Sequence, residues 1–142
     1  MGNISKNFSF SEFEASKTAD ELGIDNAIPE SVKPAICALV DTCLQPLRDD
    51  IDAPVNIQSG FRCKELNEAV DGSKTSQHPK GEASDIRSPF YTSLELARRA
   101  VALELPFDQL ILYPTFVHIS HKLKGKQRGQ ILYNRRYNGE KI

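Results

Sequence analysis

Two histidines and one aspartate stand where their side chains can converge on a metal ion. His78 and Asp85 are seven residues apart, and a turn at residues 79–81 would fold the Asp85 carboxylate back toward the His78 imidazole. His118 lies in the apolar run 116–120, which predicts a strand with the imidazole on one face. The spacing therefore suggests a metal site, although each histidine taken singly also fits a core or surface position.

Two imidazoles and one carboxylate form the ligand set of a catalytic zinc site, in which a fourth position is left open for water. Zinc lowers the pKa of its bound water from about 15.7 to about 7 and polarises a scissile carbonyl. Other divalent ions accept the same ligands, so zinc is inferred here from ligand type.

Short strands are expected around these residues. Alternation of apolar and polar residues predicts a half-buried strand at 55–59, and a second short strand is expected at 83–86. The runs 107–113 and 116–120 predict a hairpin, and the run 129–133 predicts an edge strand.

Helices are expected between the strands. Apolar residues recur at three- and four-residue spacing after Pro29 and predict one long helix that ends at residues 49–50. A further helix over 94–103 would be capped by Ser93. A short helix is expected over 62–70, with these residues facing inward: Leu66, Ala69 and Val70. Helices packed on a small antiparallel sheet make an α+β fold.

The composition is that of one ordinary globular domain, taken here as residues 1–142. Of the 142 residues, 39% are hydrophobic and 26% are charged, which is typical of soluble proteins. No apolar run approaches the length of a membrane span, so no membrane insertion is expected. Residues 1–13 lack a basic region followed by an apolar one, and we expect no signal peptide.

The charge is small overall but uneven. The formal net charge of −1 does not indicate a nucleic-acid partner. Residues 122–142 nevertheless hold seven basic residues against Glu140 alone. Such a basic segment can attract polyanions by long-range steering, and it equally fits a solvated hairpin.

Three cysteines show no metal-binding or redox spacing. Cys37 and Cys43 fall in a helical, apolar context and are expected to be buried thiols of a reduced protein. Cys63 follows Arg62 in a loop, a position that allows exposure, and no histidine lies close in sequence to activate it.

Four ordered motifs carry a resemblance to a known family. They are Ser-Gly-Phe-Arg at 59–62 with Leu-Asn at 66–67, Ser-Gln-His-Pro-Lys-Gly-Glu-Ala-Ser-Asp at 76–85, Phe-Asp-Gln-Leu-Ile at 107–111 and Val-His-Ile-Ser at 117–120. In this order they resemble the M15 family of zinc D-Ala-D-Ala carboxypeptidases, in particular the M15A-like peptidases of bacteriophages and bacteria. Segments 7–13 and 22–26 are also similar, so the resemblance covers nearly the whole chain.

The resemblance implies a hedgehog/D-Ala-D-Ala-peptidase-like fold and a Zn²⁺ ion held by His78, Asp85 and His118. It also implies that Arg62 lies in the substrate cleft, where its planar fork would hold a peptide carboxylate or carbonyl. Ser76 would lie beside the metal as a supporting polar group.

The chain departs from the family pattern at the general base. Many relatives carry Glu or Asp three residues before the last zinc histidine, and this chain has Thr115, which cannot take a proton from zinc-bound water. His121, Asp108 and Glu82 are the alternative candidates. His121 would point to the opposite strand face unless the chain bends, Asp108 can be positional, and Glu82 is expected to face solvent.

The leading hypothesis is a monomeric zinc peptidase that hydrolyses peptidoglycan stem or cross-bridge peptides, as a carboxypeptidase or an endopeptidase. It would be made in the cytoplasm and act on the cell wall after release or as part of a phage particle. The alternative, which Thr115 supports, is a zinc-containing module that binds the cell wall with little or no catalysis.

Overall fold

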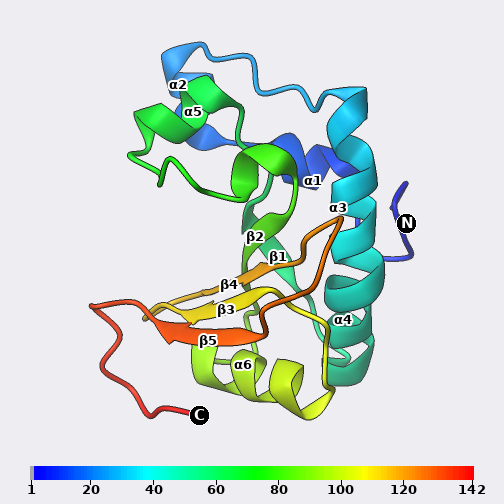
Figure 1. The fold of residues 1–142 in the computed structure, drawn as a ribbon, viewed down its shortest axis with the longest axis vertical. Helices are drawn as coiled ribbons and strands as arrows, with labels where there is room; N and C mark the ends of the chain where they lie inside the picture. The colour runs from blue at the N-terminus through cyan, green and yellow to red at the C-terminus, as the bar shows by residue number, and fades with distance from the viewer. Residues whose placement is uncertain (1) are drawn as a thin grey trace.

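The computed structural model describes residues 2–142 as an α+β fold built on one five-stranded sheet (Figure 1). The strands are β1 (Asn56–Ser59), β2 (Ala83–Arg87), β3 (Gln109–Leu112), β4 (Val117–Ser120) and β5 (Gln130–Tyr133). The helices are α1 (Phe10–Glu14), α2 (Lys17–Leu22), α3 (Lys33–Leu39), α4 (Gln45–Ile51), α5 (Lys64–Ala69) and α6 (Ser93–Ala102). Three short segments complete the elements: η1 (Glu30–Val32), η2 (Val40–Leu44) and η3 (His78–Lys80).

The sheet has the order β1-β2-β4-β3-β5 and is antiparallel except at its last pair. β5 lies at the edge, as expected, but it runs parallel to β3, with Gln109 opposite Gln130. The expected all-antiparallel sheet is thus mixed at one edge. The reason is that residues 121–129 carry the chain back to the start of β3 before β5 begins.

The long helix expected after Pro29 is present as η1, α3, η2 and α4 in succession, and it ends at Ile51. η2 is a π-helical turn, in which the Gln45 amide donates to the Val40 carbonyl five residues back. Pro46 follows it and has no amide hydrogen to continue the α-helical pattern at that point. The widened turn keeps the apolar stripe facing the core: Ile36, Leu39, Val40, Leu44 and Leu47 are all buried.

The core lies between this long helical segment, the sheet and α6 (Figure 1). α6 packs against α4, β3 and β4. Its buried apolar residues recur at helical spacing and are Leu96, Ala97 and Ala100, while Arg98 and Arg99 face outward as expected. The sheet presents one face to this core and leaves the opposite face of β2 and β4 free to carry polar side chains.

Two local predictions are corrected by the structure. The cap of α6 is Thr92: its hydroxyl accepts from the Glu95 amide, and its own amide donates to the Glu95 carboxylate. Ser93 instead donates its hydroxyl to the Phe116 carbonyl. In α5, Leu66 is buried as expected, but Ala69 and Val70 are exposed because the helix ends there beside a cleft.

All three cysteines are free thiols. Cys43 is buried as expected, and burial raises its pKa to about 11, so it is an inert core residue. Cys37 is only half-buried, since it lies at the border of the apolar stripe. Within residues 2–142, no helix is both long and apolar enough to cross a membrane.

Candidate metal centre

Asp85 and His118 come together because their strands are neighbours in the sheet. β2 and β4 pair in antiparallel register with Asp85 directly opposite His118, although 33 residues separate them in the sequence. Directly opposed residues on one face of such a pair have neighbouring side chains. The Nδ1 atom of His118 lies 3.0 Å from Oδ1 of Asp85.

His78 reaches the same point from η3, the short helical turn before β2. The His78 amide donates to the Ser76 hydroxyl at 3.1 Å, which holds the start of this turn. The turn ends at Gly81, whose φ of +73° suits glycine, and a Cβ there would meet Val32 Cγ1 at 2.5 Å. The expected turn at 79–81 is therefore present, and it directs His78 toward Asp85.

The imidazole of His78 is oriented by the backbone. Its Nδ1–H donates to the Gly60 carbonyl at 2.6 Å, which leaves Nε2 facing Oδ1 of Asp85 at 3.5 Å. In a metal-binding histidine, the ring nitrogen that does not bind the metal usually donates to a carbonyl, carboxylate or water, which orients the ring. Sequence reasoning missed this contact, because a backbone carbonyl carries no signature in the residue types.

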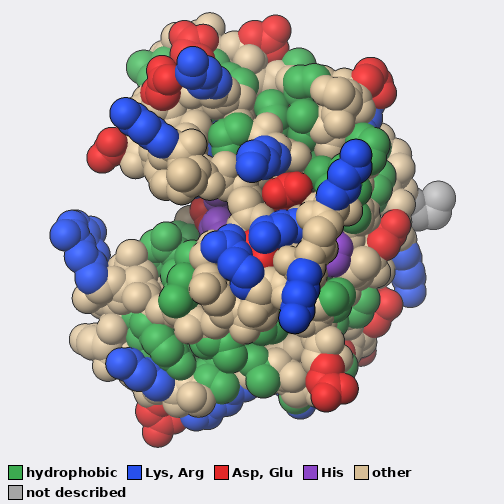
Figure 2. All heavy atoms as spheres, viewed as in Figure 1, with side chains coloured by type: hydrophobic (Ala, Val, Ile, Leu, Met, Phe, Trp, Pro, Cys, Tyr) green, Lys and Arg blue, Asp and Glu red, His purple; other side chains and the backbone are tan. Residues whose placement is uncertain are grey.

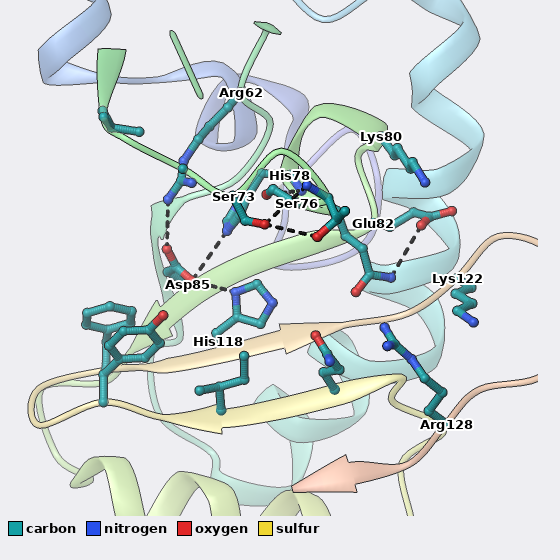
Figure 3. A pocket seen from close by; sticks show the side chains of 18 of the residues that line it. Arg62, Ser73, Ser76, His78, Lys80, Glu82, Asp85, His118, Lys122 and Arg128 are labelled. Carbon is teal, nitrogen blue, oxygen red and sulfur yellow. Dashed lines mark hydrogen bonds and ion pairs between the residues drawn. The ribbon is translucent and has the colours of Figure 1, made fainter. Parts of the chain in front are cut away.

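The three side chains form one buried group (Figure 3). One ligand atom from each of His78, Asp85 and His118 lies within 4.8 Å of the others. Two ligands at about 2.0–2.1 Å from a tetrahedral zinc ion are about 3.3 Å apart, and the observed separations of 3.0 and 3.5 Å bracket that value. The residues present therefore fit a metal ion of this size.

The charge at the centre is that of an ionised carboxylate. Burial alone would raise the pKa of Asp85, but the adjacent imidazoles of His118 and His78 outweigh it and hold this pKa well below its usual range. Metal ligands must be deprotonated to bind, and the Asp85 carboxylate meets this condition at neutral pH.

Arg62 lies beside the group and lines the same cleft (Figure 3). Its Nη2 donates to Oδ2 of Asp85 at 3.3 Å, and its other nitrogens donate to Ser59 at 3.0 Å and Asn67 at 3.3 Å. The side chain is 18% exposed and lines the cleft. Each of the three guanidinium nitrogens thus has one acceptor, which fixes the direction of the side chain.

A cleft of about 770 Å³ runs over His78, Asp85 and His118, which we call the metal group. Figure 2 shows a hollow on this face of the molecule with a histidine side chain visible inside it. Tyr113 and Phe116 form part of the wall, with their rings stacked 4.3 Å apart at the turn between β3 and β4. Sequence reasoning missed this aromatic pair, which the hairpin brings together.

The candidate bases are placed differently from one another. His121 does not line the cleft, and its Nδ1–H donates to the Pro106 carbonyl at 2.6 Å. Asp108 is fully buried, accepts from Arg128 at 2.7 Å and does not itself line the cleft.

Glu82, expected to face solvent, is half-buried and lines the cleft, because the Leu123 amide donates to its carboxylate at 3.1 Å. Thr115 is exposed in the β3–β4 turn and does not line the cleft. The roles of His121 and Asp108 in catalysis stay predictions.

Comparison with known proteins gives one family match. The family model described as Peptidase M15 matches residues 6–120, which include the metal group and Arg62 and end at the last residue of β4. A search of the curated proteins found no match.

Proposed function

The chain belongs to the Peptidase M15 family, and from this membership together with the buried His–Asp–His group we propose that it is a zinc peptidase acting on bacterial peptidoglycan. The observation that carries the proposal is the convergence of His78, Asp85 and His118 inside a cleft that also holds Arg62. A zinc ion bound there would supply a Lewis acid and an activated water for hydrolysis of a peptide bond.

The residues of the chain have separate tasks in this proposal. His78, Asp85 and His118 hold the metal, and the Gly60 carbonyl fixes one imidazole in its binding orientation. Arg62 offers the remaining N–H groups of its guanidinium to a carboxylate or carbonyl of the peptide. Its bonds to Ser59 and Asp85 hold the guanidinium in one orientation for this contact. The Tyr113–Phe116 pair provides an apolar wall along which a peptide can lie.

The substrate class is part of the proposal. Peptidoglycan stem and cross-bridge peptides are the substrates that the resemblance to M15A-like peptidases implies, with the protein acting as a monomer at the cell wall. The cleft volume of about 770 Å³ is within the range of sites that bind small organic ligands.

The test combines metal analysis with hydrolysis. Purified protein is expected to hold about one zinc per chain by elemental analysis, and His118→Ala is expected to lose it. Wild-type protein should release peptides or D-alanine from purified sacculi, and His78→Ala and His118→Ala should release none. Unchanged hydrolysis in both variants would refute the proposed metal mechanism.

A binding module is the second candidate, and Thr115 is the observation that favours it. The position where many relatives carry an acidic base has a hydroxyl, and neither His121 nor Asp108 lines the cleft. A protein that retains zinc and binds sacculi but releases no peptide would support this second function.

A further inference from the structure

One end of the cleft is strongly basic. Lys80, Lys122, Lys124 and Arg128 all line it. In Figure 3, Lys80, Lys122 and Arg128 lie on the far side of the His–Asp–His group from Arg62. Figure 2 shows Lys and Arg side chains gathered at the middle of this face, next to the hollow. We call these four residues the basic end of the cleft.

Most of the basic end comes from outside the region that the family model matches. Lys122, Lys124 and Arg128 follow the matched residues 6–120, whereas Lys80 lies in η3. Three of the four cations therefore lie in segment 121–128, after the matched residues.

The backbone of this segment is held in place against the rest of the domain. The His121 amide donates to the Glu82 carbonyl at 2.8 Å, and the Leu123 amide donates to the Glu82 carboxylate at 3.1 Å. The side chain of Gln127 closes a loop on Lys122 with bonds of 2.8 and 2.9 Å. The lysines are thus presented by an ordered loop.

The basic end keeps an excess of positive charge. Arg128 pairs with the buried Asp108, and Lys122 lies 3.8 Å from the same carboxylate. Glu82 is the other acid at this end. Lys80 and Lys124 form no ion pair with any of residues 2–142. Four cations against two carboxylates leave the two unpaired lysines available to an anionic ligand.

Building on the proposed peptidase function, we propose that Lys80 and Lys124, supported by Lys122 and Arg128, form a subsite for an acidic group of the substrate peptide. The basic end and the metal group belong to one continuous cleft, so a peptide lying over the metal group extends into the basic end. A free carboxylate of the peptide gains charge-assisted hydrogen bonds there. Asp71 also lines the cleft and repels an acidic group placed close to it, which favours the basic end.

The test uses two stem peptides, L-Ala-γ-D-Glu-L-Lys-D-Ala-D-Ala, that differ only at the glutamyl α-carboxyl, which is free in one and amidated in the other. Wild-type protein loaded with zinc should show a kcat/KM about five- to tenfold higher for the free acid, as two exposed ion pairs allow. This preference should shrink as salt is raised, because exposed charges are screened over about 10 Å at 0.1 M.

The variants separate the subsite from general electrostatics. In Lys80→Gln/Lys124→Gln the preference should fall to about one, since both unpaired cations are removed. Lys64→Gln/Lys126→Gln changes the net charge equally at exposed residues outside the cleft and should keep the wild-type preference. Equal hydrolysis of both peptides by wild-type protein, or the same preference in Lys80→Gln/Lys124→Gln, would overturn the subsite and leave the peptidase proposal standing.

If wild-type protein hydrolyses neither peptide, the peptidase proposal fails for these substrates, and binding then decides the subsite. Fluorescence anisotropy of the two labelled peptides should show about five- to tenfold tighter binding of the free acid, lost in Lys80→Gln/Lys124→Gln. Equal affinity for both peptides would overturn the subsite. Tighter binding of a phosphate polymer than of either peptide would overturn it as well.

Discussion

The Asp85 carboxylate joins the two parts of the site. Its Oδ1 faces both histidines at 3.0 and 3.5 Å, while Oδ2 accepts from Arg62 at 3.3 Å. One side chain thus fixes the distance between the metal group and the arginine proposed to hold the substrate. A shift of Asp85 would move both, so the effects of substitutions at these residues should not be additive.

Arg62→Lys tests whether the planar guanidinium of Arg62 binds the substrate. Lysine keeps the charge but loses the planar fork that contacts Ser59, Asn67 and Asp85 together. We expect KM for a hydrolysed peptide to rise about tenfold, equivalent to about 1.4 kcal/mol, with zinc content unchanged. Arg98→Lys, on the exposed face of α6, is the control and should change neither quantity. A wild-type KM in Arg62→Lys would contradict the substrate role.

Gly81→Ala tests the turn that directs His78. Gly81 and Gly125 both have positive φ, of +73° and +91°, but only at Gly81 would a Cβ meet other atoms, Val32 Cγ1 at 2.5 Å. Both alanine variants carry a backbone cost of about 1 kcal/mol, and Gly81→Ala adds a steric cost of about 1–3 kcal/mol. Urea unfolding should show this difference, and metal titration should show weaker zinc binding in Gly81→Ala alone. Equal stability of the two variants would show that the turn adjusts freely.

At the scale of elements, Asp108 organises the edge of the sheet. Its carboxylate binds Arg128, its amide donates to Ser120 and its carbonyl accepts from Gln130, so it ties β4 and β5 to the start of β3. Burial would raise the pKa of Asp108, but Arg128 and Lys122 outweigh it and lower this pKa to about 2. Asp108, in the motif Phe-Asp-Gln-Leu-Ile, therefore stabilises this edge of the sheet.

Asp108→Asn is expected to lower the free energy of unfolding by about 1–2 kcal/mol at pH 7, a value reduced for screening because Arg128 is 44% exposed. The folded-state pKa lies below the unfolded value of about 3.9, so the stabilisation is complete above about pH 4 and disappears as the pH falls through about 2. Urea unfolding of both proteins across this range should show the difference shrinking toward acid.

The matched control is Asp50→Asn, which removes the exposed pair between Asp50 and Arg99 and should cost less than about 0.5 kcal/mol. If the cost of Asp108→Asn stays constant from pH 7 to pH 2, the contribution of Asp108 is packing rather than charge.

For the molecule as a whole, the metal group joins parts that are distant in sequence. It links η3, β2 and β4, while the core lies on the other side of the sheet between the long helix and α6. A bound ion is therefore expected to stabilise the fold without being required for it, because the hydrophobic core is formed by other residues.

Zinc removal tests whether a bound ion stabilises the fold without being required for it. Zinc at a hundred times its dissociation constant adds about 2.7 kcal/mol to the folded state, which corresponds to about 5–10 °C in Tm for a domain of this size. A chelator should lower the Tm of wild-type protein by this amount and leave a cooperative transition. His118→Ala should show no response to the chelator. An identical Tm of the wild-type protein with and without chelator would show that no ion is bound at this group.

The sequence by itself determined the elements and the ligand types of the site. Apolar spacing predicted the long helix after Pro29 because one buried helical face needs that periodicity. Alternation predicted the strand at 55–59, and short apolar runs predicted the others. The motifs identified the family and named His78, Asp85 and His118, which the structure brings together. These features depend on local spacing or on family motifs, so they can be predicted from the sequence.

The tertiary structure alone decided the contacts between distant segments. The opposition of Asp85 and His118 depends on strand register, and the support of His78 by Gly60 depends on a backbone carbonyl. The parallel placement of β5 and the basic end of the cleft depend on the path of residues 121–129. None of these contacts can be predicted from a repeating pattern in the sequence. Each depends on which elements pack together, and the order of the elements in the chain does not show which ones are neighbours in space.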